Sequence, residues 1–170
     1  AENSAAYPAS IAAGEPLTVR TVPTIADGIA VARPGDIPFD LIQEYVDEIV
    51  TVSEDDIARA LLVLLERAKQ VVEPAGAVGV AAILAGLVVP TGPTAVVLSG
   101  GNIDPLLLQR VVAHGLAASG RYMSLQIPLP DRPGQLARVS ELLAIAGANV
   151  IEVLHTRHGQ GIQISEVILQ

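Results

Sequence analysis

The stretch from Ala95 to Pro105 combines polar side chains with a turn that can expose them. Its first four residues, 95–98, are all apolar, which is typical of a strand buried on both faces. Ser99 and Gly100 follow directly and place a hydroxyl and backbone amides at the end of that strand. Asp104 then supplies an N-cap for a helix. Because ligands of open α/β sheets bind beyond the carboxyl ends of the strands, the sequence predicts a ligand site at Ser99 and Gly100.

Two further segments carry polar residues at turns and helix ends. Asp27 and Gly28 form a turn signal before an apolar triplet, and glycine permits the positive φ of such turns. Glu73 precedes Pro74 at the start of an apolar helix predicted over residues 75–87. As local structure, Gly28 is a turn residue and Glu73 is a cap that complements the helix dipole. A role at a ligand site remains an alternative to these structural roles for both residues.

The elements around these residues predict an α/β fold. A strand is predicted over residues 48–52, and Ser53 is predicted to cap a long helix with Asp56 as its capping partner. The acidic residues of the first turn, among them Glu54, complement the helix dipole and are assigned no further function. Helices on a parallel sheet fit a composition with 51% hydrophobic and 2% aromatic residues. The apolar residues of the long helix recur at helical spacing and form one buried face: Ile57, Leu61, Leu64, Leu65 and Ala68.

Four segments resemble, in order and spacing, the threonine dehydratases, which are also called threonine ammonia-lyases. They are residues 24–31, 47–57, 73–82 and 98–104, within a match that runs from Ala1 to about His114. These enzymes belong to the second fold type of pyridoxal-phosphate enzymes, the tryptophan synthase β-like type, and are related to serine racemase. The resemblance implies that residues 1–118 form part of such a lobe with a parallel sheet. It also implies pyridoxal 5'-phosphate as the cofactor.

The resemblance assigns roles to the residues described above. It implies that Ser99 hydrogen-bonds the pyridine nitrogen of the cofactor and that Gly100 lies beside it. It also implies that the backbone around Gly28 approaches the ring and that Glu73 lies close to the ring. A hydroxyl cannot hold the ring nitrogen charged as a carboxylate would, so the ring is a weaker electron sink and suits β-elimination. The implied reaction converts L-threonine or L-serine to 2-oxobutanoate or pyruvate and ammonia.

The lysine that the resemblance requires has no match in this sequence. The single lysine, Lys69, lies in a solvated helical segment unlike the family's lysine motif. Since the chain begins at Ala1 without methionine and ends at Gln170 within a strand pattern, we expect the Schiff-base lysine to lie upstream and the isolated chain to be inactive. The alternative is a non-catalytic amino-acid-binding regulatory protein that keeps the scaffold.

Residues 119–170 follow a different pattern, strand, helix, strand, strand. With the turn from Asp131 to Leu136, this order resembles the ACT regulatory domains, here an incomplete ferredoxin-like α+β module that binds small amino acids. The resemblance implies that Gly134 and Asp131 contact a regulatory ligand. The unpaired edge expected along residues 124–129 predicts pairing with a second subunit, hence a homo-oligomer.

Composition excludes several classes of partner. A formal net charge of -8 with only 10 lysines and arginines argues against nucleic acid. The longest apolar run, residues 75–90, contains three glycines and is shorter than the roughly 20 residues that span a bilayer, so no membrane partner is expected. The sequence has no cysteine, which excludes disulfides and thiolate metal sites and favours a cytoplasmic location.

No metal site is predicted. Glu2 matches a glutamate of the divalent-metal site of serine racemases, but Pro8 stands at the position of the aspartate. His155 and His158 are three residues apart in a predicted strand and hairpin, so they face opposite sides unless the bend joins them.

Overall fold

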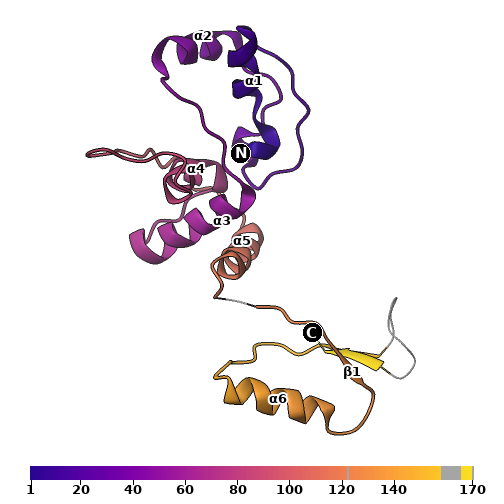
Figure 1. Cartoon of the computed structure of the whole chain (residues 1–170). Helices are drawn as coiled ribbons and strands as arrows, with labels where there is room; N and C mark the ends of the chain where they lie inside the picture. The colour runs from indigo at the N-terminus through magenta and orange to yellow at the C-terminus, as the bar shows by residue number, and fades with distance from the viewer. Residues whose placement is uncertain (122, 158–165, 170) are drawn as a thin grey trace. The chain divides into compact units, whose positions relative to one another are not determined.

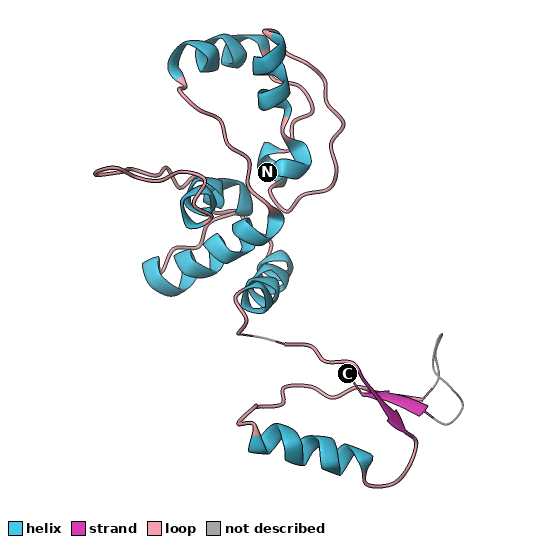
Figure 2. Cartoon of the chain, viewed as in Figure 1, coloured by secondary structure: helices cyan, strands magenta, loops and turns pink. Residues whose placement is uncertain are grey.

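The computed structural model of the chain describes residues 1–121, 123–157 and 166–169. It divides into two units, Ala1–Tyr122 and Met123–Gln170. Regular structure in the first unit is helical, and the strands lie in the second unit (Figure 2). The predicted domain boundary, after residue 118, lies at the end of the last helix, whereas the first unit extends to Tyr122.

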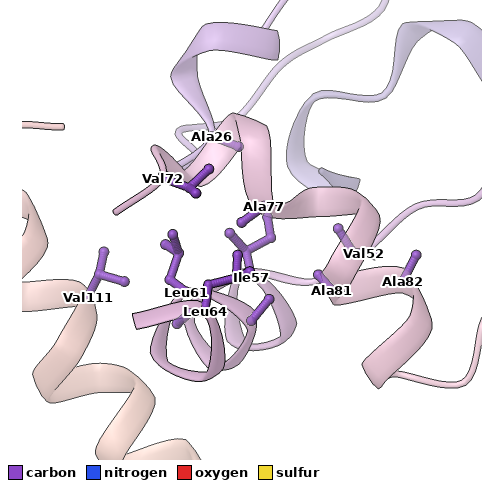
Figure 3. Close-up of a cluster of buried hydrophobic side chains, with 12 residues drawn as sticks. Ala26, Val52, Ile57, Leu61, Leu64, Val72, Ala77, Ala81, Ala82 and Val111 are labelled. Atoms are coloured by element: carbon purple, nitrogen blue, oxygen red, sulfur yellow. The ribbon is translucent and has the colours of Figure 1, made fainter. Parts of the chain in front are cut away.

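Three helices form the core of the first unit (Figure 1). The helix α3 (Glu54–Val63), which continues as a π-helix over Leu64–Ala68, packs against both α4 (Pro74–Leu84) and α5 (Pro105–Ala118). Their contact surfaces carry small and aliphatic side chains, which allow close approach of the helix axes. Ten members of this cluster are labelled in Figure 3: Ala26, Val52, Ile57, Leu61, Leu64, Val72, Ala77, Ala81, Ala82 and Val111.

The predicted starts of α3 and α5 are confirmed, whereas the helix Asp36–Tyr45 begins four residues before Asp40, the start that the sequence pattern predicts. At α3, the Asp56 amide donates to Ser53 Oγ at 3.1 Å, and the Ser53 amide donates to Asp56 Oδ2 at 3.4 Å, which completes a capping box. At α5, the Leu106 amide donates to Asp104 Oδ1 at 2.9 Å. Each cap satisfies backbone donors that have no partner inside the helix.

The remaining helices of the first unit are short. They are a 3-10 helix Glu2–Ser4, α1 (Ala6–Ala13), a 3-10 helix η2 (Asp27–Ile29) and α2 (Asp36–Tyr45). Of these, η2 contacts α4, so the turn with Asp27 and Gly28 lies against the core. Within the three described ranges, no helix is long and apolar enough to cross a membrane.

The strands predicted for the first unit are not formed. Residues 48–52 and 95–98 have no regular secondary structure, and Val97 is 82% exposed instead of buried. A strand is held by backbone hydrogen bonds to a neighbouring strand. No segment of residues 1–121 supplies such a ladder, so these apolar runs remain irregular.

The second unit contains a helix and a three-stranded antiparallel sheet of order β1-β3-β2. The predicted helix is confirmed, with Gly147 at φ 73° just beyond its end. Three strands in the predicted order are present among the described residues. The loop predicted over residues 157–160 lies mostly outside the described residues, as does His158. The elements are β1 (Ile127–Pro130), α6 (Gln135–Ile145), β2 (His155–Thr156) and β3 (Glu166–Leu169).

Two prolines determine which edge of β1 can pair. Pro128 and Pro130 have no N–H, so the ladder to β3 runs through Ile127, opposite Leu169, and through Leu129. The backbone groups of the two prolines therefore point toward the other edge of β1, where neither proline supplies an N–H donor. The carbonyl of Pro130 already accepts from the Arg132 amide at 2.8 Å. Pairing of this edge with a further strand, as the sequence predicted for residues 124–129, is thus disfavoured at residues 128–130.

Candidate functional site

Three segments that are distant in sequence meet at the first turn of α4. The Glu73 amide donates to the Gly100 carbonyl at 3.1 Å, which joins the turn after residue 98 to the helix. A Cβ added at Gly100 would lie 2.2 Å from Glu73 Cδ, and one added at Gly28 would lie 3.2 Å from Glu73 Oε1. The Glu73 carboxylate therefore packs against both glycines. The structure brings together Gly28, Glu73 and Gly100, three of the four residues predicted for the cofactor site, and Ser99 adjoins them.

Gly76 completes this arrangement, and the sequence interpretation missed it. A Cβ at this buried position of α4 would lie 1.7 Å from the Ser99 carbonyl oxygen, so the helix and the backbone of Ser99 are in direct contact. One turn further, a Cβ at Gly79 would lie 2.9 Å from Val96 Cγ1. The i, i+3 spacing of these two glycines on an otherwise apolar helix is the signal that predicts a close backbone neighbour.

The Ser99 side chain is exposed beside this contact. In the portion of the chain that the structure describes, its hydroxyl has no hydrogen-bond partner. Gly100 has φ 77°, a conformation that other residues rarely adopt, and it turns the chain sharply after Ser99. A neutral hydroxyl that can donate or accept is thus exposed at the residue before Gly100, whose backbone packs against Glu73.

Glu54 holds the segment that leads to Gly28. The Thr24 hydroxyl donates to Glu54 Oε1 at 2.5 Å, and the Ile25 amide donates to Glu54 Oε2 at 2.7 Å. The Ala26 amide donates in turn to Thr24 Oγ1 at 3.1 Å. The interpretation of Glu54 as a partner of the helix dipole is therefore incomplete, because both carboxylate oxygens also accept hydrogen bonds from a segment about 30 residues away.

These residues fit a flat aromatic cofactor with a ring nitrogen. Gly28 and Gly100 carry no side chain, so their backbone lies directly against the Glu73 carboxylate and can approach a ring beside it closely. Ser99 supplies one neutral hydrogen-bonding group, and the exposed site lies at a helix N-terminus. Lys69 is placed differently: its Nζ donates to the Glu66 carbonyl at 2.8 Å at the end of the π-helix.

The second unit contains a cavity of about 320 Å³ at the turn between β1 and α6. Its lining includes Asp131 and Arg157, whose Nε lies 3.3 Å from Asp131 Oδ2, and the apolar side chains of Leu129 and Leu169. Gly134 lines the cavity at φ 88°, with no atom within 4 Å of where its Cβ would be. Both residues predicted to bind a regulatory ligand, Asp131 and Gly134, thus line one cavity. Among the described residues, no group of three metal-ligating side chains is present.

Comparison with known proteins places this geometry in a family. Residues 1–100 match the family model described as pyridoxal-phosphate dependent enzyme. The L-threonine ammonia-lyase of Thermotoga maritima is 47% identical over 163 residues, which cover 96% of this chain and 41% of that protein. Threonine deaminase isoform 2 of Solanum lycopersicum, in its processed form, matches with a TM-score of 0.60 and 29% identity, over 66% of this chain and 34% of that one. Maize serine racemase matches with a TM-score of 0.58 and 29% identity, over 70% of this chain and 38% of that one.

The chain thus spans between about a third and two fifths of the length of these relatives. The likeness confirms the predicted fold class, part of a lobe of the second fold type, although the strands of that lobe are not formed among residues 1–121. The match covers Gly28, Glu73, Ser99 and Gly100. The chain belongs to the family of pyridoxal-phosphate-dependent enzymes.

Proposed function

We propose that the chain supplies the ring side of the cofactor site in an enzyme that deaminates L-threonine or L-serine by β-elimination. The observation that supports this most directly is the meeting of Gly28, Glu73, Ser99 and Gly100 at the start of α4. It occurs in a chain that is 47% identical to an L-threonine ammonia-lyase. The products are 2-oxobutanoate from threonine or pyruvate from serine, with ammonia.

Each residue of the site has a distinct role in this proposal. The cofactor, when bound, withdraws electrons from the α-carbon of the amino-acid substrate. The Ser99 hydroxyl hydrogen-bonds the ring nitrogen and, being neutral, does not hold it charged. Gly28 leaves room for backbone to face the ring, and Gly100 turns the chain so that Ser99 is presented. Glu73 lies at the N-terminus of α4 and brings its carboxylate next to the ring.

We further propose that residues 123–170 form an ACT-like regulatory unit that binds a small aliphatic amino acid. The cavity beside Gly134 supports this, because Asp131 and Arg157 offer one charge of each sign to the ammonium and carboxylate of a zwitterion. Leu129 and Leu169 offer an apolar wall to its side chain. The alternative, a non-catalytic amino-acid-binding protein, is supported by the same cavity and by Lys69, whose Nζ donates to the Glu66 carbonyl.

The catalytic proposal is tested with Ser99→Ala in the complete enzyme. Loss of one hydrogen bond to the cofactor costs about 1 to 3 kcal/mol, so we expect a roughly ten- to hundredfold lower turnover with an unchanged unfolding temperature. Thr94→Ala is the control, since it removes an exposed hydroxyl, bonded to the Gly92 carbonyl at 3.0 Å, from the same connecting segment. Turnover of Ser99→Ala equal to that of the wild type, measured as 2-oxobutanoate formed from threonine, would show that Ser99 is only a turn residue.

The regulatory proposal is tested with Gly134→Asp, which adds a side chain and a negative charge where the ligand carboxylate lies. We expect calorimetry with isoleucine or valine to detect binding to the wild type and none to the variant. Gly147→Asp is a matched control, because Gly147 also has positive φ and open space around its Cβ but lies at the other end of α6. Equal binding by wild type and Gly134→Asp, or none by the wild type, contradicts the proposal.

A further inference from the structure

We propose that Glu54 is a positioning residue for the cofactor site and sets the place of the Gly28 turn relative to Glu73. The inference rests on the proposed function, since it concerns the same site. It goes beyond that function because Glu54 is not one of the residues proposed to face the cofactor and acts on the site through Thr24 and Ile25.

The first step is the contact between Glu54 and the segment before Gly28. One carboxylate oxygen accepts from a side chain and the other from a backbone amide, at 2.5 and 2.7 Å. Hydrogen bonds to an ionised acceptor are the stronger kind, and two of them fix both the position and the orientation of the segment. Ala26, the next residue, is fully buried in the core cluster (Figure 3). Each of the three successive residues Thr24, Ile25 and Ala26 is therefore held in place.

The second step is the connection from Ala26 to Gly28. The Ile29 amide donates to the Ala26 carbonyl at 3.2 Å, and the Ala30 amide donates to the Asp27 carbonyl at 3.0 Å. These bonds make η2 a single rigid turn that starts at the held segment. Gly28 is the middle residue of η2, so the position of Gly28 is determined by the segment that ends at Ala26.

The third step connects Glu54 with Glu73. Glu54 lies in the first turn of α3, Glu73 caps α4, and these two helices pack against each other through Ile57, Ala77 and Ala81 (Figure 3). Packed helices move little relative to each other because their side chains interdigitate. Glu54 therefore links the Gly28 turn to the same rigid frame that carries Glu73, and the Cβ position of Gly28 lies 3.2 Å from Glu73 Oε1 as a result.

The contacts of the neighbouring carboxylates, Asp55 and Asp56, show that the positioning role differs from a general effect of negative charge at the start of α3. Asp55 lies in the same turn, but its Oδ1 faces His114 of α5 at 2.5 Å and its side chain is 69% exposed. Asp56 closes the capping box with Ser53. All three carboxylates complement the helix dipole, whereas the two hydrogen bonds to the segment that leads to Gly28 belong to Glu54.

The test compares Glu54→Ala, Asp55→Ala and Glu54→Gln in the complete enzyme. Glutamine keeps an oxygen for the Ile25 amide and turns its NH2 group toward the Thr24 hydroxyl, whereas alanine removes both contacts. Three quantities are measured: the dissociation constant of pyridoxal 5'-phosphate by absorbance titration, hydrogen exchange of the amides of residues 25–30, and the unfolding temperature.

We expect Glu54→Ala to weaken cofactor binding by about tenfold, from the loss of two hydrogen bonds to a charged acceptor, and to speed exchange in residues 25–30. Glu54→Gln should bind the cofactor more tightly and exchange more slowly than Glu54→Ala, and Asp55→Ala should change neither cofactor binding nor exchange. If Glu54→Ala and Asp55→Ala affect cofactor binding equally, Glu54 acts only on the helix dipole and the inference is wrong.

A second pair of variants covers the case in which Glu54→Ala does not fold. Thr24→Val removes the hydroxyl that donates to Glu54, and Thr24→Ser keeps it. Weaker cofactor binding by the valine variant and normal binding by the serine variant are expected, and equal binding by both overturns the inference. A wild-type enzyme that binds no pyridoxal 5'-phosphate contradicts the proposed function instead, so the two failures are distinguishable.

Discussion

Gly76→Ala places one methyl group between α4 and the backbone of Ser99. In the structure the added Cβ would lie 1.7 Å from the Ser99 oxygen, 2.8 Å from the Ser99 carbonyl carbon and 2.9 Å from Val72 Cγ1. A carbon and an oxygen that are not bonded cannot approach this closely. Either the turn at Ser99 and Gly100 or the start of α4 must move by more than an ångström.

Two opposing terms determine the sign of the change in stability. Alanine is the better helix former, which stabilises the variant by about 1 kcal/mol. Overpacking a well-packed contact costs about 1 to 3 kcal/mol, and loss of the hydrogen bond from the Glu73 amide to the Gly100 carbonyl costs about 1 kcal/mol more. The net expectation is a free energy of unfolding lower by about 1 to 3 kcal/mol.

The assay is thermal unfolding followed by the helical circular-dichroism signal. For a chain of this length, 1 kcal/mol corresponds to about 2 to 4 °C, so a 2 kcal/mol loss lowers Tm by about 4 to 8 °C. Gly79→Ala is the control on the same helix, because its Cβ would meet only the Val96 methyl group, at 2.9 Å, and a side chain can rotate away. We expect Gly79→Ala to change Tm by much less. A Gly76→Ala variant as stable as the wild type would refute the contact between α4 and Ser99.

Three further predictions concern single side chains, each measured by urea denaturation. Ser53→Ala should lower the free energy of unfolding by about 1 kcal/mol, since it removes the capping box of α3, and an unchanged midpoint would show that the cap is dispensable. Gly100→Ala should lower it by about 1 to 2 kcal/mol, because alanine disfavours φ 77° and its Cβ would overlap the Glu73 carboxylate; a stability equal to wild type contradicts this. Ser4→Ala should stabilise by up to about 1 kcal/mol, because the buried Ser4 hydroxyl has no hydrogen-bond partner within the described residues, and a destabilised variant would reveal one.

The residues of the candidate site were predicted one by one from local patterns, and the resemblance implied that they lie around one ring, but the contacts that join them were not predicted. Ser99 and Gly100 were predicted from a turn that follows an apolar run, and Gly28 and Glu73 from a turn and a helix start. The contacts that join them are made across the fold: Glu73 to Gly100 by a backbone hydrogen bond and by packing of the carboxylate. Their roles toward the cofactor stay predictions until the variants above are measured.

Helix starts and turns were determined by the sequence itself. The capping box of Ser53 and Asp56 and the cap of Asp104 appear where local pattern predicts them, and α6 ends just before Gly147, which has φ 73°. The physical reason is that a helix makes its hydrogen bonds within four residues and a cap within three, so the necessary partners are neighbours in the sequence.

Only the tertiary structure decided the strands, the role of Glu54 and the contact at Gly76. Residues 48–52 and 95–98 have the composition of strands but no ladder among residues 1–121, because a strand depends on partners that its own sequence does not contain. Glu54 has the same local setting as Asp55, and it is the packing that turns one toward Thr24 and the other toward His114. Contacts between residues far apart in the chain depend on how helices pack, and a single side-chain pattern is compatible with several such packings.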